Sequence, residues 1–189
     1  MLYMTKTQQN LLKAFAGESQ ARNKYLMFAK VARKKDLEWI ARVFEETADN
    51  ERVHAQELFE LITERVEVTG DLSIAPFSED TGKNLKTAAE GEKFEWTTMY
   101  PDFEKIAKEE GEAEPERLFR ELKETEEKHE ERYIILARHM DAGTLYNQEK
   151  ELEWKCLNCG YVYVGKTPPQ TCPLCQKPST WYEPLGLVR

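Results

Sequence analysis

Four cysteines near the carboxyl end of the chain have the spacing of a metal site. They form two Cys-x-x-Cys pairs separated by twelve residues, and the four are Cys156, Cys159, Cys172 and Cys175. This pattern is typical of a tetrahedral four-thiolate site. The pattern alone leaves two metals open, because a structural zinc ribbon and a one-electron iron site use the same ligands. Aromatic residues flank the cysteines and would exclude water, which favours iron.

Ionisable side chains interrupt apolar stripes in the rest of the chain. Where apolar residues recur every three or four positions, each of four stripes contains one or two such side chains, namely Glu18, then Glu51 with His54, then Glu92 with Glu95, then Glu126 with His129. Burying five carboxylates without compensation is prohibitive, because each desolvated charge costs several kcal/mol. Metal cations would balance them, and a mixture of carboxylate and imidazole ligands favours iron.

The spacing of these ligands indicates a binuclear site. Glu51 with His54 and Glu126 with His129 are pairs three residues apart, so each pair lies on one helix face. A lone glutamate from each of two helices and a Glu-x-x-His motif from each of the other two is the ligand pattern of ferritin-like di-iron bundles. A single helical glutamate is usually a solvated surface group. The interpretation depends on four stripes having acids at matching depths.

The elements that must position these residues are four amphipathic helices, predicted at 7–34, 36–65, 79–110 and 115–142. Short turns make each successive pair an antiparallel hairpin, and residues 66–78 are long enough to cross the end of a bundle. Thr5 and Gln8 predict a capping box, Gly143 predicts a C-terminal cap, and Pro101 predicts a kink in the third helix.

Composition divides the chain into two domains, a helical one at 1–145 and a metal-binding tail at 146–189 that is rich in proline and cysteine. The formal net charge of -8 argues against a nucleic-acid partner. The sequence has neither a membrane-length apolar run nor the apolar run of a secretory signal. We therefore expect a cytoplasmic protein, in which paired cysteines bind metal rather than form disulfides.

In their order and combination, these motifs resemble those of the rubrerythrin family over essentially the whole chain. The resemblance implies a mostly α fold, with a ferritin-like four-helix bundle followed by a small β-rich rubredoxin-like domain. It also implies a cytoplasmic peroxidase that protects against oxidative stress by reducing hydrogen peroxide. Such an enzyme is typically a homodimer and receives electrons from rubredoxin or from a separate NAD(P)H-dependent reductase.

The resemblance also implies a role for each ligand. Two irons in an oxo- and carboxylate-bridged site would be bridged by Glu51 and Glu126. Glu18 and His54 would bind one iron, and Glu92 and His129 would bind the other. Glu95 would exchange with His54 as the oxidation state changes, and Tyr25 and Tyr100 would border the pocket. The third iron would occupy the four-cysteine site, where zinc is the alternative.

The sequence is also compatible with two other functions. One is a ferroxidase or iron-detoxifying bundle, which would not need a dedicated site for receiving electrons. The other is a non-enzymatic zinc-ribbon protein whose helices mediate contacts. Metal analysis distinguishes them, because the peroxidase predicts three irons per chain and the zinc-ribbon protein predicts one zinc and no iron.

Overall fold

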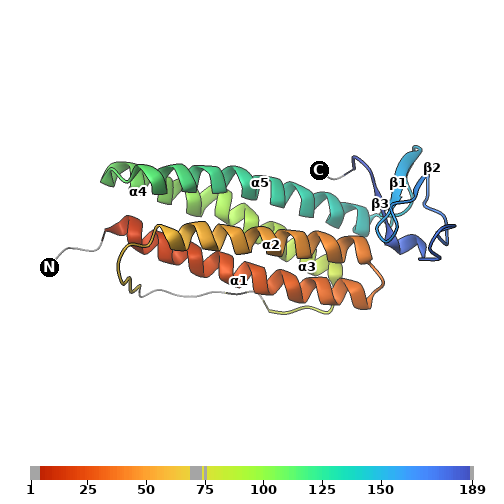
Figure 1. Cartoon of the computed structure of the whole chain (residues 1–189), viewed down its shortest axis with the longest axis horizontal. Helices are drawn as coiled ribbons and strands as arrows, with labels where there is room; N and C mark the ends of the chain where they lie inside the picture. Colours follow the sequence, from red (N-terminus) through yellow and green to blue (C-terminus); the bar gives the residue numbers. More distant parts are fainter. Residues whose placement is uncertain (1–4, 69–73, 75, 188–189) are drawn as a thin grey trace.

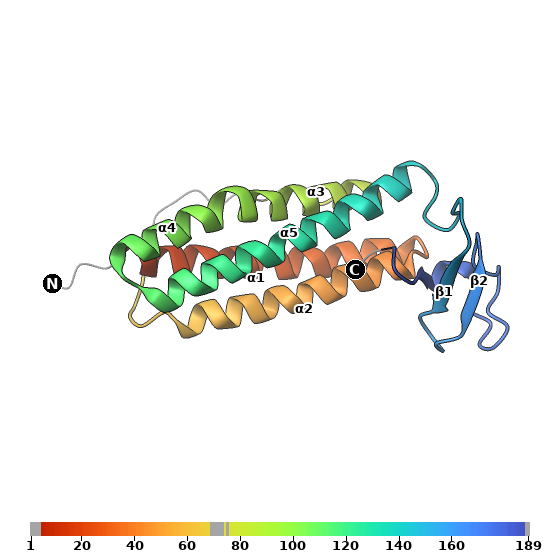
Figure 2. The ribbon, with the colours of Figure 1, turned by 90° about the horizontal axis from the view of Figure 1, so that it is seen from above.

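The computed structural model describes residues 5–68, 74 and 76–187. Its helical part is a four-helix bundle, and the helices run along one long axis with the tail at one end (Figures 1 and 2). The bundle consists of α1 (Lys6–Lys34), α2 (Glu38–Glu60), α5 (Ala113–Asp141) and a third rod composed of α3 (Thr81–Phe94), the π-helix η1 (Glu95–Met99) and α4 (Tyr100–Glu110). The predicted mostly α fold is confirmed.

The two helix hairpins are present, but the connection between them differs from the prediction. Helix α2 ends at one end of the bundle and α3 begins at the other, so the two helices run in the same direction (Figure 1). The expected crossing at one end of the bundle is therefore wrong, because a connection between parallel helices has to cover the length of the bundle. Residues 69–73 and 75 of this segment lie outside the described residues.

The third rod contains a π-turn, where a proline kink was predicted. The Tyr100 N–H bonds to the carbonyl of Glu95, five residues back. Pro101 follows directly and lacks the N–H that a regular helix would direct at Thr97. At 100° per residue, an uninterrupted α-helix would place Tyr100 about 80° from Glu92. The π-turn accommodates one extra residue and so brings Tyr100 back toward the face of Glu92.

Local contacts at the start of α1 explain where α2 ends. Thr5 Oγ1 accepts a hydrogen bond from the Gln8 N–H (3.1 Å), which is the first half of the predicted capping box. The second half is wrong, because the Gln8 side chain instead donates to the Leu61 carbonyl (3.0 Å) and accepts from the Thr63 N–H (3.1 Å). These bonds fix the chain just after α2, which ends at Glu60 although the prediction extended it to residue 65.

The tail is a small three-stranded antiparallel sheet with the order β2-β1-β3. Its strands are β1 (Leu152–Cys156), β2 (Val162–Gly165) and β3 (Tyr182–Pro184), and the short 3₁₀ helix η2 (Ser179–Trp181) precedes β3. Trp154 is fully buried, and its indole N–H donates to the Gly165 carbonyl (2.9 Å). Gly143, at φ 65°, ends α5 as predicted. The proposed domain boundary at 145 lies between α5 and β1.

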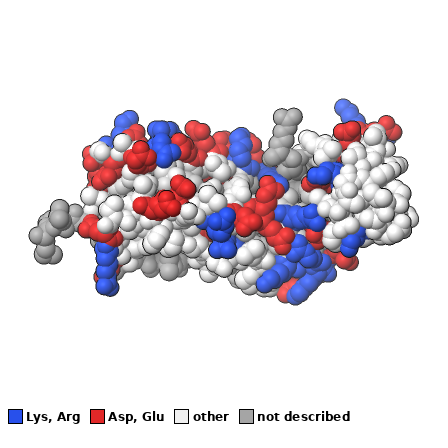
Figure 3. Space-filling model, viewed as in Figure 1, with Lys and Arg blue, Asp and Glu red and all other residues white. Residues whose placement is uncertain are grey.

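The surface of the bundle mixes charges of both signs. On the face in Figure 3, acidic and basic side chains alternate over the helices, while most of the tail surface is uncharged. On this face the described residues form no extended basic stripe of the kind that follows a nucleic-acid backbone. Among the described helices, none combines the length and apolar character needed to cross a membrane.

Candidate metal centres

Each rod of the bundle contributes acidic side chains to one internal cluster. Glu18 comes from α1, Glu51 from α2, Glu92 from α3 and Glu126 from α5, and all four are at most 1% exposed. Isolated carboxylates are almost never buried to this degree, so the cluster requires compensating charge. The structure thus places four of the five predicted acids side by side in the interior.

The cluster resolves into two sets of four ligands. Glu18, Glu51, His54 and Glu126 form one set, and Glu51, Glu92, Glu126 and His129 form the other. Within each set the ligand atoms lie within 4.8 Å of one another. Glu51 and Glu126 belong to both sets, so the geometry is that of two neighbouring cation positions with two shared carboxylates.

The two imidazoles lie between the shared carboxylates. His54 Nδ1 is 2.8 Å from Glu51 Oε2 and 3.1 Å from Glu126 Oε1. His129 Nδ1 is 2.7 Å from Glu126 Oε2 and 3.3 Å from Glu51 Oε1. Burial alone would lower the pKa of each imidazole, but bonds to Glu126 and Glu51 raise the pKa of His54 to about 10 and that of His129 to about 9.

The lone glutamates and the chemistry of the donors fit a pair of hard cations. Burial, followed by the charges of neighbouring carboxylates, raises the pKa of Glu18 and of Glu92 well above the ordinary value. Glu18 Oε2 and Glu92 Oε2 are buried and have no hydrogen-bond partner among the described residues. Divalent iron would use these oxygens and would replace the protons as compensating charge.

Two tyrosines hold the lone glutamates in a reciprocal arrangement. The Tyr25 hydroxyl of α1 donates to Glu92 Oε1 of α3, and the Tyr100 hydroxyl of α4 donates to Glu18 Oε1 of α1. Both tyrosines are at most 1% exposed, and burial raises the pKa of both phenols. Each lone glutamate therefore has one oxygen held by a phenol and the other free for a ligand.

The fifth predicted acid, Glu95, lies at the edge of the cluster. It begins the π-helix and belongs to neither set of four ligands. Burial and then the charges of Glu126 and Glu51 raise its pKa to about 8. Glu95 is therefore close enough to interact with the cluster, from a part of the helix with irregular geometry.

One polar pair next to the cluster was not predicted from the sequence. Trp96 Nε1, in the π-helix, donates to Glu130 Oε2 at 2.6 Å. Glu130 directly follows His129, so this bond ties the turn that contains Glu95 to a helix that contains predicted ligands. A glutamate beside a histidine in a charged helix carries no signal of such a contact, because the partner is 34 residues away.

The four cysteines also converge. Cys156 Sγ is 3.7 Å from Cys175 Sγ, and Cys159 Sγ is 3.6 Å from Cys172 Sγ. Metal–sulfur bonds of about 2.3 Å in a tetrahedron place the sulfurs about 3.8 Å apart, whereas a disulfide requires about 2.05 Å. The separation fits four thiolates around one metal.

Neighbouring polar groups stabilise these thiolates. Burial would raise the pKa of Cys172, but the neighbouring Tyr182 phenol and the N–H groups of Cys175 and Leu174 lower it to about 6. The residue after each pair is left-handed, Gly160 at φ 78° and Gln176 at φ 61°. Glycine adopts this conformation readily, whereas the glutamine of the second turn gives no signal of it in the sequence.

Comparison with known proteins accounts for both sites. A family model described as rubrerythrin matches residues 9–137, and one described as rubrerythrin, rubredoxin-like domain matches residues 154–183. The chain is 43% identical over 182 residues to rubrerythrin of Porphyromonas gingivalis, which covers 96% of this chain and 90% of that protein. It is 42% identical over 187 residues to rubrerythrin-1 of Clostridium acetobutylicum, which covers 96% of this chain and 95% of that protein.

A solved structure of fully reduced, all-ferrous nigerythrin is similar over the whole chain. It is 33% identical with a TM-score of 0.64, and the match covers 97% of this chain and 91% of that one. With the geometry described above, these matches identify the internal cluster as a di-iron carboxylate site and the four cysteines as a rubredoxin-like site.

Proposed function

The chain belongs to the rubrerythrin family of oxidoreductases, and we propose that it reduces hydrogen peroxide to water with electrons that enter through its four-cysteine iron site. The overall reaction combines one peroxide with two electrons and two protons and releases two waters. The observation that carries the proposal is the presence, in one chain, of a buried binuclear ligand cluster and a site suited to one-electron transfer.

Six side chains are the proposed ligands of the two irons. Glu51 and Glu126 would be shared, because both belong to each set of ligand atoms. Glu18 with His54 would complete one position, and Glu92 with His129 would complete the other. When bound, the irons supply electrons to the peroxide and polarise its O–O bond.

Glu95 is the proposed seventh ligand, which exchanges with His54 as the oxidation state changes. Its place in a π-turn supports this role, because backbone of this kind is frequent at functional sites. An additional carboxylate stabilises the more highly charged ferric state. The Trp96–Glu130 bond restrains the same turn, so any movement of Glu95 begins from a defined position.

Tyr25 and Tyr100 position the lone glutamates and exclude water from them. Each phenol retains its proton because burial raises its pKa, so each donates to a carboxylate and does not accept from one. Their hydroxyl protons are the buried protons nearest to Glu92 Oε1 and Glu18 Oε1. They are the proposed first donors for the oxygen atoms of the substrate.

The partners and the compartment complete the proposal. A rubredoxin or an NAD(P)H-dependent reductase would supply electrons, the protein would act as a homodimer or a larger homo-oligomer, and the cytoplasm would provide the reducing conditions under which the four cysteines remain thiolates. Electron transfer from the tail of the partner subunit is the proposed route within a dimer. The ligand separations in the tail support a metal site and are incompatible with disulfides.

Steady-state peroxide consumption with an NADH-linked donor system tests the proposal. The parent chain is expected to turn over many times. Cys156→Ser is expected to reduce peroxide once and then stop, because the helical cluster remains but its electron supply is lost. Glu95→Ala is expected to turn over more slowly than the parent. If the parent chain did not consume peroxide but continuously oxidised added ferrous iron, this result would contradict the proposal and favour a ferroxidase.

A further inference from the structure

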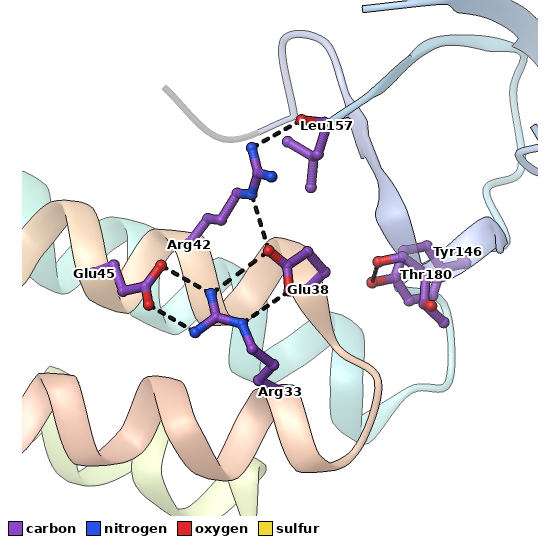
Figure 4. A network of polar contacts seen from close by, with 7 residues as sticks. All are labelled: Arg33, Glu38, Arg42, Glu45, Tyr146, Leu157 and Thr180. Atoms are coloured by element: carbon purple, nitrogen blue, oxygen red, sulfur yellow. Dashed lines mark hydrogen bonds and ion pairs between the residues drawn. The ribbon is translucent and has the colours of Figure 1, made fainter. Parts of the chain in front are cut away.

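A network of charged side chains lies at the end of the bundle that faces the tail (Figure 4). Its centre is Glu38 in the first turn of α2, which is only 5% exposed. Arg33 Nε donates to Glu38 Oε2 and Arg42 Nε donates to Glu38 Oε1, both at 3.0 Å. Arg33 also holds Glu45 through two bonds, of 2.7 and 2.8 Å. Glu38 therefore fixes the position of both guanidinium groups.

Arg42 connects this network to the tail. Its Nη1 donates to the Leu157 carbonyl at 2.9 Å (Figure 4). Its guanidinium also lies 5.7 Å from the centre of the Trp181 ring. Leu157 directly follows Cys156 in the first cysteine loop, and its N–H donates to the Trp181 carbonyl at 2.8 Å. The Leu157 side chain packs against the main apolar core of the bundle. The first cysteine loop is thus attached to α2 by polar and apolar contacts together.

Neighbouring aromatic residues make the same junction more rigid. The Tyr146 hydroxyl donates to the Thr180 carbonyl at 3.2 Å. The Tyr146 ring lies between Trp39 of α2 and Trp154 of β1, with ring centres 6.5 and 6.4 Å away. The tail is therefore joined to α2 by aromatic contacts in addition to those of Arg42.

Two properties of Arg42 are suited to a site that accepts electrons. A guanidinium can hold Glu38 and Leu157 at the same time because its nitrogens form a rigid fork, which a lysine ammonium lacks. Its positive charge lies beside a loop that contains a nearly buried thiolate ligand, Cys156, at 1% exposure. Reducing a four-thiolate iron takes one electron from a reduced flavoprotein or rubredoxin. The site becomes one unit more negative, no proton moves and no bond changes, so a nearby cation favours the reduced form.

We infer that Arg42 is a positioning residue for electron transfer, which docks the first cysteine loop on α2 and makes the four-cysteine iron easier to reduce. The inference rests on the proposed function in that it takes iron to occupy the tail. Its effect on the potential is modest, because 41% of the Arg42 side chain is exposed and solvent screens part of the charge.

Arg42→Gln tests the inference in the full-length iron-loaded protein. We expect backbone amides of residues 156–160 to exchange with deuterium at least threefold faster than in the parent. At a fixed potential we expect the ratio of reduced to oxidised tail iron to fall at least threefold, which is about 28 mV at 59 mV per tenfold change. Arg117→Gln is the matched control, because Arg117 also binds two glutamates on a helix surface but lies near the start of α5, and this helix starts at the end of the bundle away from the tail (Figure 1).

Arg42→Lys provides a second variant that keeps the charge. We expect its potential to stay near that of the parent while residues 156–160 exchange faster, because an ammonium cannot span both partners. The inference is overturned if Arg42→Gln has the parent's exchange rate or the parent's potential, or if Arg117→Gln changes both as strongly. A tail that held zinc would contradict the proposed function, and the exchange rates would still decide whether Arg42 docks the loop.

Discussion

Loading metal into the helical cluster should release protons, and the structure indicates how many. His54 and His129 have pKa values of about 10 and about 9 in the metal-free chain, so both are protonated at pH 7. Each imidazole must lose its proton to bind a metal through nitrogen. At least two protons are therefore released for each pair of metals that binds. The pKa values of Glu18, Glu92 and Glu95 are also raised by burial and by neighbouring carboxylates, so deprotonation of these groups adds to the release.

The number of protons released determines how strongly the affinity of the helical cluster for metal depends on pH. With at least two protons released for each pair of metals, the overall binding constant should fall at least a hundredfold for each unit that the pH drops between 8 and 6, or about 2.7 kcal/mol. Competition with a chelator at pH 6, 7 and 8 measures the slope. Calorimetry in buffers of different ionisation enthalpy counts the protons directly.

The control for this measurement is the state of the tail, whose thiolates also release protons when they bind metal. The titration should begin with protein whose four-cysteine site is already filled, as verified by metal analysis. A binding constant that did not change with pH, or a release of less than one proton per metal pair, would refute the arrangement of imidazolium groups between shared carboxylates.

Three further predictions concern stability. Folding raises the pKa values of His54, His129 and Glu95. The folded state therefore binds more protons than the unfolded state, and this stabilisation is complete below the unfolded pKa values and is lost as the pH rises through the folded pKa values. The Tm of the metal-free protein should therefore fall between pH 6 and 9. Tyr25→Phe removes a buried donor to Glu92 and should lower the free energy of unfolding by about 1 to 3 kcal/mol in urea titrations. Gly160→Ala places a side chain at φ 78° and should destabilise the tail by about 1 to 2 kcal/mol, measured as faster metal loss to a chelator.

Two control variants test whether these stability changes are specific to the residues named. Tyr163→Phe, on the exposed strand β2, should leave the free energy of unfolding unchanged, and an equal loss in both tyrosine variants would contradict a specific role for the buried hydroxyl. Gln176→Gly, at the equivalent turn of the second cysteine pair, should slow metal loss, and a faster loss would contradict the argument from backbone conformation. A Tm that rose between pH 6 and 9 would contradict the first prediction.

Periodicity predicted most of the site because buried acids are rare. Glu18, Glu51, Glu92 and Glu126 stand out as charged residues at positions where burial of a charge is costly, so their placement follows from the order of residues along the chain. A different signal found the cysteines, because two Cys-x-x-Cys pairs are typical of a tetrahedral site. Sequence patterns reveal ligands that recur at a regular spacing along one helix or within one loop.

The remaining features depend on long-range contacts or on irregular backbone. No regular period predicts the π-turn, so the sequence put Tyr100 away from Glu92 and assigned the distortion to Pro101. The direction of the connection between α2 and α3 depends on how the hairpins pack. Arg42 is a surface residue in any helical pattern, and its partner Leu157 is 115 positions away. Such contacts form only when the two domains meet.

The most direct test of the account is the location of bound iron. Anomalous diffraction from crystals of the iron-loaded protein should show two peaks between Glu51 and Glu126, with Glu18 and Glu92 on opposite sides, and a third peak among the four cysteines. A single peak in the bundle, or none, with these glutamates directed into solvent, would contradict the central claim that the buried carboxylates exist to hold two metals.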